Sequence, residues 1–337
     1  RLAPYTTVKI GGPAEVFCQV DTTKDLADLT IYAKQHALDI TILGWGANTL
    51  IADRGIRGLV VKNTANAVAV LPSVPEGALS SRVVPRWDDT ARQQHLPQKH
   101  VTHGEHVAVR VDAGTPLSYL INTLLQQNIV GLEWFARIPA TLGGAIYNNI
   151  HGAHTFISDY IHSVEVVGED GRIHTLPANK LAFAYDYSRF HHTNEVILSA
   201  ILLLYKGNGT KALKQSIDWA KAKKHHPQNS LGCIFQNLSA QDQARLALPT
   251  PSVSYVIDQV LDLKGFTIGG ARVSEKHAAF IENTANATAD EYLAVIKHLQ
   301  AVAREQSGVQ LQPEIFFKGF TTDELAGVIH TDTYNTL

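Results

Sequence analysis

The segment LGWGANTLIADRGIRG, residues 43–58, places four glycines and one asparagine between two apolar stretches. A glycine inside a regular element costs about 0.5–1 kcal/mol relative to alanine. This segment therefore needs the bare backbone for a tight turn, for close packing, or for a ligand that lies on the main chain. Backbone N–H groups in such a loop can bind phosphate. Because GWGAN is not the G-x-G-x-x-G dinucleotide pattern, the segment alone favours turns over a phosphate loop.

Regular elements are predicted on both sides of this segment. Residues 9–20 read as a turn followed by a strand. Residues 22–36 read as a helix, since they open with threonine caps and an early aspartate and keep apolar side chains at helical spacing. Short β-rich runs at 39–44 and 58–63 flank the glycines directly. This order of strands, helix and loop indicates an α/β arrangement at the amino end.

Residues 64–106 differ from their surroundings because they are polar, rich in proline and without a sustained hydrophobic period. A long irregular segment inside a compact domain is uncommon, so we interpret it as an insertion that is partly structured at most. Its histidines stand at positions 95, 100, 103 and 106. No cysteine lies near them, and zinc ligands normally follow a tighter spacing. We therefore predict no metal site.

The rest of the chain is predicted to continue with helices and strands. The clearest helix covers 115–128, with Thr115 as its cap and Pro116 at its first position. Two strands, 162–168 and 172–176, meet at the turn EDG and predict a hairpin. Further strands are predicted at 106–114, 194–207 and 308–317, and further helices at 210–224, 252–262 and 289–306.

Composition and charge narrow the class of protein. The 337 residues suggest about two domains, and 45% hydrophobic and 18% charged residues are typical of globular proteins. A formal net charge of −2 without a basic cluster argues against a nucleic-acid-binding surface. The apolar run at 195–205 is shorter than the ~20 residues of a membrane-spanning helix. The only cysteines, Cys18 and Cys233, make no disulfide framework, so we expect a cytoplasmic protein.

A second glycine-rich stretch, IPATLGGAIYNN, occupies residues 138–149. Two glycine-rich loops that each follow predicted secondary structure fit a large phosphate-bearing cofactor held by backbone amides. Close packing of a helix on a strand at Gly143 and Gly144 explains the same residues. The local pattern leaves both interpretations open.

Three polar positions towards the carboxyl end are candidates for chemistry. Cys233 lies beside a glycine, and an ordinary thiol with a pKa of about 8.5 is mostly protonated at neutral pH, which suits a proton donor as well as a nucleophile. A lone cysteine is more often a small buried hydrophobe. Lys276, beside His277, suits a bound phosphate or a solvated turn. Glu314 is either a charge at a strand edge or a functional carboxylate.

Taken in order, these motifs resemble one family, the UDP-N-acetylenolpyruvoylglucosamine reductases of peptidoglycan precursor synthesis. LGWGANTLIADRGIRGLVV resembles the family's first flavin loop, normally G-x-G-S-N-x-L, and RIPATLGGAIYNN resembles its second, normally G-I-P-G-T-x-G-G-A. YDYSRF and GCIFQN stand where the family has Y-R-x-S-x-F and G-S-x-F-x-N-P. The remaining matching segments are TTVKIGGPAE, GGARVSEKHAAFIEN and PEI. The resemblance runs over nearly the whole chain outside 64–106.

The resemblance implies an α+β fold class, in which a two-subdomain α/β FAD-binding fold of the vanillyl-alcohol-oxidase/PCMH type carries a smaller α+β substrate domain. The implied division assigns 1–63 to FAD-binding subdomain 1, 64–106 to the insertion, 107–207 to FAD-binding subdomain 2, 208–320 to the substrate domain and 321–337 to a tail. The implied contacts to non-covalently bound FAD are Gly44, Gly46, Ala47, Asn48, Thr49, Pro139, Thr141, Gly143, Gly144 and Asn149.

The resemblance also implies the reaction. NADPH reduces the flavin, which then passes hydride to UDP-N-acetylglucosamine enolpyruvate to give UDP-N-acetylmuramate. By position, Cys233 is the proton donor, Glu314 is the carboxylate at the enol, and Asn237 and Lys276 contact the UDP-sugar. Tyr185 matches the tyrosine of the catalytic motif. The implied partner is a small-molecule UDP-sugar, without nucleic acid or membrane.

This chain departs from the family at the catalytic arginine, which follows the tyrosine of Y-R-x-S and is replaced here by Asp186. Losing one preorganised donor to a developing oxyanion typically costs about 10²–10³ in rate, so we expect another cation to take over. Arg189 is the nearest candidate, and it shares a face with Asp186 in a helix but not in a strand. Arg137 is another. Further departures are Ala47, Ala140, Gln236 and Leu238.

Two other functions stay open on these residues. Asp186 prompts the first, a flavoprotein of the same fold that acts on another substrate. The second is a non-catalytic protein that binds UDP-sugars. Because Tyr185, Ser188, Cys233 and Glu314 are all present, we favour a divergent enzyme over one that has lost its activity.

Overall fold

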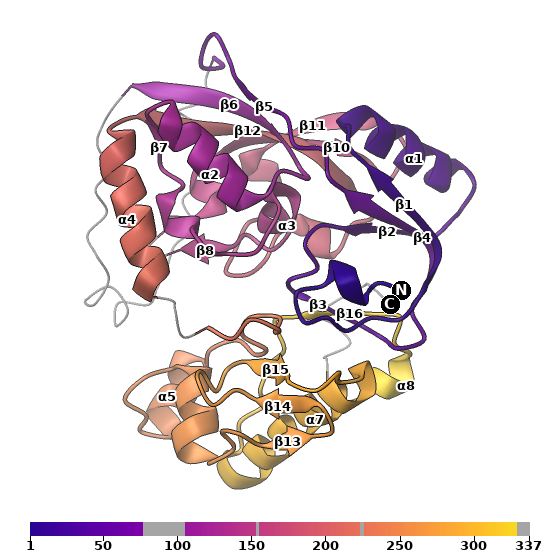
Figure 1. Cartoon of the computed structure of the whole chain (residues 1–337), viewed down its shortest axis with the longest axis vertical. Coiled ribbons are helices and arrows are strands. Elements are labelled where there is room, and N and C mark those ends of the chain that lie inside the picture. The colour runs from indigo at the N-terminus through magenta and orange to yellow at the C-terminus, as the bar shows by residue number, and fades with distance from the viewer. Residues whose placement is uncertain (77–104, 153–154, 223–225, 329–337) are drawn as a thin grey trace. The chain divides into compact units, whose positions relative to one another are not determined.

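The computed structural model describes residues 1–76, 105–152, 155–222 and 226–328, and Figure 1 labels its elements. The described residues form two compact units, each assembled from segments that are separated in the sequence. Unit 1 holds residues 1–16, 45–58 and 226–328, and unit 2 holds 17–44, 59–76, 105–152 and 155–222. The glycine-rich segment 43–58 therefore contributes to both units. The division into flavin-binding and substrate domains stays a prediction.

An antiparallel sheet forms the centre of the described part of unit 2, with the strand order β11-β10-β12-β6-β5 and with β7 paired to β12. Its strands are β5 (Val68–Val70), β6 (His106–Asp112), β7 (Ile129–Val130), β10 (Ile161–Val167), β11 (Ile173–Pro177) and β12 (Val196–Lys206). The predicted hairpin and the predicted strands at 106–114 and 194–207 are thereby confirmed. β5 lies inside the predicted insertion, most of which, 77–104, lies outside the described residues.

Helices α2 (Leu117–Gln126) and α3 (Leu142–Tyr147) pack on one face of this sheet (Figure 1). Val107, Val109 and Val111 of β6 share one buried core with both helices. Ala108, between the first two of these valines, belongs to a separate cluster, as the alternation of side chains along a strand requires. α4 (Gly209–Ala222) packs against α2.

A smaller sheet has the order β1-β4-β2, with β1 at Ala14–Val20, β2 at Ile40–Leu43 and β4 at Ile56–Asn63. β2 and β4 run in parallel with Leu43 opposite Lys62. α1 (Thr23–Gln35) begins after the predicted cap, since the Thr22 side chain accepts from the Asp25 N–H. Ligands of α/β sheets bind outside the carboxyl ends of parallel strands, and here Gly44 follows such an end.

Unit 1 is built around the sheet β13-β14-β15, against which α7 packs. Its elements are β3 (Thr49–Ile51), α5 (Ala240–Arg245), α6 (Val253–Tyr255), β13 (Thr267–Ile268), β14 (Ala271–Val273), β15 (Ile281–Asn283), α7 (Ala289–Ser307), β16 (Phe316–Lys318) and α8 (Thr322–Leu325). α7 starts with a capping box of Thr288 and Glu291 and ends at Gly308, whose φ is 65°. β3 and β16 form a parallel pair.

Short elements complete the described chain. β8 (His151–Gly152) and β9 (Thr155–Phe156) form a small antiparallel pair. Short 3-10 helices are η1 (Ala3–Tyr5), η3 (Glu133–Phe135), η4 (Ile157–Asp159), η5 (Ala178–Lys180) and η6 (Arg189–His191). Among the helices of the described ranges, none combines the length and the apolar character that crossing a bilayer requires.

Three predicted elements differ from the structure. α2 begins at Leu117 with Pro116 as its cap residue, because Pro116 pairs with Thr141 in an isolated bridge. The predicted helix at 252–262 is a short α6 followed by a π-helical turn, η7 (Val256–Val260). The predicted strand at 308–317 is reduced to β16.

The shortened strand has a local cause. Pro313 lacks the N–H that a strand ladder needs, and it pairs with Phe235 only through an isolated bridge.

Candidate active site

The two predicted flavin loops meet in unit 2, at Gly44 and Thr141. A Cβ added to Gly44 would lie 2.6 Å from Thr141 Oγ1, so a larger residue could not fit without displacing the threonine. Lys62 Nζ donates a hydrogen bond to the Gly44 carbonyl, and burial lowers the pKa of Lys62 below its ordinary value. Sequence analysis missed Lys62. Its signal is a lysine near the end of a parallel strand, beside the strand that leads into the glycines.

The glycine pair at the start of α3 serves two purposes. Gly143 packs closely on the end of β6, since its N–H donates to the Ala113 carbonyl at 2.7 Å and an added Cβ would lie 3.0 Å from Ala113 Cβ. Gly144 is exposed, and an added Cβ would meet only Thr141 Oγ1, at 3.5 Å. The Thr141 hydroxyl accepts from the Gly144 N–H at 3.3 Å. Gly143 therefore fits the interpretation of close helix–strand packing, whereas the main chain at Gly144 is open to a ligand.

Asn149 connects this stretch to the turn that carries Tyr185. Its side chain is fully buried. Its Nδ2 donates to the Ala184 carbonyl at 2.7 Å, and its Oδ1 accepts from the Ser158 N–H at 3.2 Å. Because the amide is bonded to main chain at both ends, Asn149 holds the turn in place.

Tyr185 and Asp186 form a two-residue turn. Ala184 and Tyr187, on either side of it, exchange both backbone hydrogen bonds, at 3.0 and 3.3 Å. Asp186 has a φ of 47°, a left-handed conformation that aspartate tolerates better than most residues. The Tyr185 ring stacks on His151, with ring centroids 5.3 Å apart. Asp186 Oδ1 lies 3.4 Å from His151 Nδ1.

His151 is a second residue that sequence analysis did not single out. It follows the glycine-rich stretch by two positions, but its contacts with Tyr185 and Asp186 join segments far apart in the chain. No local pattern signals such a pair.

Arg189, the residue expected to replace the catalytic arginine, has its partners in neighbouring segments, and its catalytic role stays a prediction. This residue begins the 3-10 helix η6 after the turn, so neither a helix nor a strand joins it to Asp186. Its guanidinium pairs with Glu195, with Nε 3.0 Å from Oε2 and Nη2 3.2 Å from Oε1, and Nη1 donates to the Lys180 carbonyl at 3.3 Å. A guanidinium with these partners already has its charge balanced. The other candidate, Arg137, donates to the Ala220 carbonyl.

In unit 1 the structure brings together three predicted residues from distant segments. The Glu314 N–H donates to the carbonyl of Ile234, the residue after Cys233, at 2.8 Å. Asn48 Nδ2 donates to the Glu314 carbonyl at 3.0 Å. Cys233 and Glu314 are both half-buried. An added Cβ on Gly232, next to the cysteine, would meet nothing within 4 Å, so the main chain beside the thiol is open.

The first flavin loop continues into unit 1, where Gly46, Asn48 and Thr49 lie. The Phe316 N–H donates to the Asn48 carbonyl at 2.8 Å, and Thr49 lies opposite Phe316 in the β3–β16 pair. Gly46 has a φ of 57°, and an added Cβ would lie 2.6 Å from the Tyr5 carbonyl oxygen. This glycine is required both by its conformation and by its packing.

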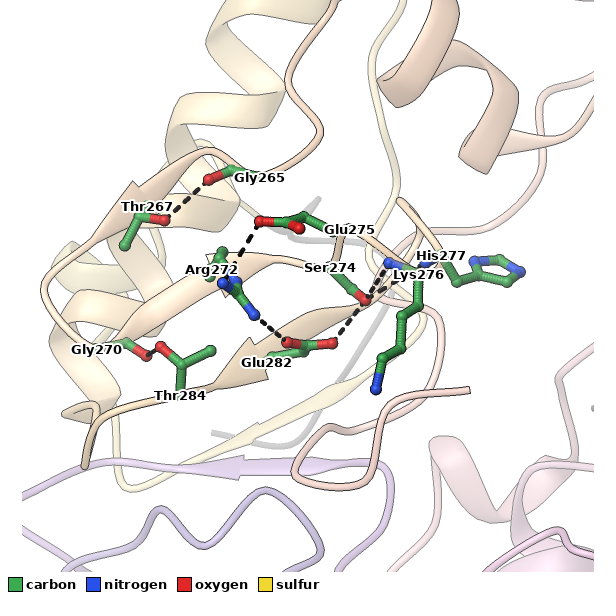
Figure 2. Close-up of polar contacts among 10 residues, drawn as sticks. All are labelled: Gly265, Thr267, Gly270, Arg272, Ser274, Glu275, Lys276, His277, Glu282 and Thr284. Atoms are coloured by element: carbon green, nitrogen blue, oxygen red, sulfur yellow. Dashed lines mark hydrogen bonds and ion pairs between the residues drawn. The ribbon is translucent and has the colours of Figure 1, made fainter. Parts of the chain in front are cut away.

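Lys276 lies in the turn between β14 and β15, which Figure 2 shows in close-up. Ser274 Oγ accepts from the N–H groups of Lys276 and His277, at 3.1 and 3.4 Å, and donates to Glu282 Oε1 at 2.7 Å. Burial alone would raise the pKa of Glu282, but the hydrogen bonds from Ser274 and Arg272 lower it below its ordinary value. The exposed Lys276 side chain extends away from the turn (Figure 2).

The remaining predictions concern Asn237 and a metal. Asn237 is half-buried, and its Oδ1 accepts from the Val253 N–H at 3.2 Å, at the start of α6. Within the ranges that the structure covers, no three histidine, cysteine or acidic side chains are grouped as a metal site requires. The histidines at 95, 100 and 103 lie outside those ranges.

Comparisons with known proteins identify relatives along most of the chain. Residues 224–317 match the C-terminal domain of UDP-N-acetylenolpyruvoylglucosamine reductase, and residues 94–177 match an FAD-binding domain. The UDP-N-acetylenolpyruvoylglucosamine reductase of Caldanaerobacter subterraneus subsp. tengcongensis is 31% identical over 318 residues, which cover 94% of this chain and 91% of that protein. The reductase of Chlamydia abortus is 31% identical over 315 residues, with coverage of 93% and 91%.

A solved structure extends the likeness to the fold. The reductase of the same name from Thermus caldophilus superposes with a TM-score of 0.69 at 25% identity, covering 94% of this chain and 97% of that one. The α+β fold class with its FAD-binding part is therefore confirmed. This chain is an FAD-dependent oxidoreductase and belongs to the UDP-N-acetylenolpyruvoylglucosamine reductase family.

Proposed function

We propose that the chain reduces UDP-N-acetylglucosamine enolpyruvate to UDP-N-acetylmuramate, with NADPH as the source of electrons. The observation that carries this proposal is the bond between the Glu314 N–H and the carbonyl after Cys233, at 2.8 Å. It places a thiol and a carboxylate, both half-buried, on neighbouring segments. The names of the relatives in Caldanaerobacter and Chlamydia support the choice of substrate.

The residues present fit FAD. In unit 2, the open main chain at Gly144 and the Lys62 ammonium beside Gly44 suit a diphosphate. The remaining proposed contacts are Gly46, Ala47, Asn48, Thr49, Pro139 and Thr141. Two further residues support the cofactor site indirectly. Gly143 allows α3 to pack closely on the end of β6, and Asn149 holds the turn that follows Ala184.

The chain's own groups complete the reduction. FAD, held by these residues, would supply hydride chemistry, and the terminal carbon of the enolpyruvyl group would accept that hydride. The electron pair of that double bond moves toward the carbon beside the carboxylate, where the Cys233 thiol delivers a proton. The overall change adds two electrons and two hydrogens to the substrate, and the resulting thiolate regains its proton from solvent. A positioned general acid contributes about 10²–10⁴ in rate.

The other proposed contacts hold the substrate. The exposed Lys276 ammonium suits the diphosphate of the UDP-sugar, and Asn237 lies on the same segment as Cys233. Glu314 acts at the enol. Tyr185, with 37% of its surface exposed, lines the substrate site.

The proposed setting is peptidoglycan precursor synthesis in the cytoplasm. Cys18 and Cys233 form no disulfide, which fits a reducing compartment. A small-molecule substrate and the net charge of −2 fit a protein without nucleic-acid partners.

Product analysis tests this proposal. The purified protein is incubated with UDP-N-acetylglucosamine enolpyruvate and either NADPH or NADH, and the UDP-sugar is analysed by mass spectrometry. We expect a product heavier by two hydrogens, formed faster with NADPH. Flavin-loaded protein that leaves this substrate unchanged would point to a flavoprotein with another substrate.

A further inference from the structure

Lys318, at the end of β16, is a lysine that the proposed reaction does not use. It is half-buried, and burial lowers the pKa of its ammonium below the ordinary value of a lysine. In the part of the chain that the structure describes, its Nζ has no hydrogen-bond or ion-pair partner. Burying a charge is costly unless an opposite charge or hydrogen bonds compensate it. This ammonium therefore lacks the partner that its position requires.

The carboxylates of the neighbouring segments are already engaged. The Ala52 N–H donates to the Lys318 carbonyl at 2.9 Å, which brings residues 52–54 beside the lysine. Asp53 Oδ2 accepts from the first N–H of α7 at 2.8 Å. Glu324, in α8, pairs with Arg54. Neither carboxylate is left to compensate the charge of Lys318.

The pairing of β16 with β3 decides which face carries Lys318. In this parallel pair Leu50 lies opposite Phe317, and both belong to the core of unit 1. Successive side chains of a strand point to opposite faces, so Thr49 and Lys318 lie on the other face, away from that core. Lys318 stands two residues after Phe316, the partner of Thr49, which is about 6.6 Å along the strand. Its ammonium, on a flexible four-carbon stem, can reach a ligand that contacts Thr49.

This face adjoins the first flavin loop. Asn48 is the residue directly before β3, and its carbonyl accepts from the Phe316 N–H at 2.8 Å. Asn48 and Thr49 are both proposed contacts of FAD. Oxidised FAD carries its negative charge on the diphosphate, and a lysine binds phosphate as a point charge. The cofactor thus supplies the kind of anion that Lys318 lacks.

We propose that Lys318 binds the diphosphate of FAD. The inference rests on the cofactor contacts of the proposed function, at Asn48 and Thr49, and not on its substrate. It explains why unit 1 keeps an uncompensated ammonium beside its core: the charge is costly in the apoprotein and is compensated when the cofactor binds.

Two measurements on the apoprotein test this role. Quenching of flavin fluorescence gives the affinity for oxidised FAD, and thermal unfolding without FAD gives the stability. A hydrogen bond to a charged group supports a loss of about 10- to 100-fold, so Lys318→Met should weaken FAD binding by this factor. Because methionine removes an uncompensated charge and keeps an unbranched side chain, the unfolding midpoint of the apoprotein should stay equal or rise. A lysine with a purely structural role would lower the midpoint as well.

Lys24 provides the matched control. It is 81% exposed and pairs with Asp28 on α1, and Lys24→Met should change neither measurement. Wild-type FAD affinity in Lys318→Met, or a lower midpoint of its apoprotein, overturns the inference. If that variant does not fold, Lys318→Gln, which also removes the charge, decides by the same two measurements.

The UDP-sugar is the other diphosphate of the proposed function. The affinity of the FAD-loaded protein for UDP-N-acetylglucosamine, measured by isothermal titration calorimetry, should be the same in Lys318→Met and wild type. A weaker affinity for this ligand with wild-type affinity for FAD would assign the lysine to the substrate and overturn the inference. Wild-type apoprotein that does not bind FAD overturns the proposed cofactor contacts themselves. Because FAD binding is measured without substrate, a failure of the proposed reaction would produce neither result.

Discussion

At the scale of single residues, the sequence does not decide the role of Cys233. From its neighbours it is either a buried hydrophobe or a proton donor. The structure gives it half-burial, open main chain at Gly232 and a bonded connection to the segment of Glu314. These three features come from parts of the chain that are distant in sequence, so no local pattern could supply them.

We predict that Cys233→Ala slows the oxidation of reduced flavin by the enolpyruvyl substrate by about 10²–10⁴. Reduction of the flavin by NADPH should keep its wild-type rate, since that step needs no proton from this thiol. Stopped-flow absorbance measures both steps separately. Cys18→Ala, in β1, is the control and should alter neither. An unchanged oxidation rate in Cys233→Ala would show that another group delivers the proton.

A second residue predicts a dependence of stability on pH. Burial is the main reason that the pKa of His191 is lowered to about 4, and the side chain is 1% exposed against the ring of Tyr147. The unfolded chain takes up this proton near the ordinary pKa of about 6.5. The neutral histidine therefore contributes full stability above pH 6.5, and this contribution is lost as the pH falls towards 4.

The free energy of unfolding should consequently be about 2 kcal/mol lower at pH 5 than at pH 7 through His191 alone. Urea titrations of wild-type protein and His191→Phe at both pH values measure this difference in the free energy of unfolding. Between pH 7 and pH 5, the free energy of unfolding of the variant should fall by about 2 kcal/mol less than that of the wild type. Equal drops in the two proteins would mean that His191 titrates normally in the folded state.

At the scale of elements, short sequence patterns predicted the helices and turns that depend on neighbouring residues. The Thr22 cap, the EDG turn and the helix at 289–306 were all predicted from the sequence, and the structure has them. The start of α2 was misplaced by one residue because Pro116 pairs with Thr141 instead of entering the helix. Contacts between elements, rather than propensity, decided that boundary.

The two glycines of α3 give a paired prediction. Gly143→Ala places a methyl group 3.0 Å from Ala113 Cβ, and such overpacking typically costs about 1–3 kcal/mol. Gly144→Ala meets only a hydroxyl at 3.5 Å, and alanine favours a helix by up to about 1 kcal/mol. Thermal unfolding without FAD should therefore show a lower midpoint for Gly143→Ala and an equal or higher one for Gly144→Ala.

The same pair separates packing from cofactor binding. FAD affinity, measured by the quenching of flavin fluorescence on binding to the apoprotein, should fall in Gly144→Ala despite its intact stability. Wild-type affinity in that variant would remove Gly144 from the proposed cofactor contacts.

At the scale of the whole molecule, the fold and the family were predicted from the order of several motifs and from no single motif. Matching motifs in sequence indicated the FAD-binding fold and the family, and the comparisons confirm both. What the order could not predict is how chain segments meet: Gly44 against Thr141, Glu314 beside Ile234, and His151 against Asp186. Each of these contacts depends on tertiary packing.

The central claim is that this chain passes electrons from NADPH to an enolpyruvyl UDP-sugar. The most direct test is an anaerobic absorbance titration of the purified protein between 300 and 550 nm, with NADPH added first and the enolpyruvyl substrate second. We predict that the flavin bands bleach with NADPH and return when UDP-N-acetylglucosamine enolpyruvate is added. Bands that bleach but stay bleached after the second addition would contradict the claim.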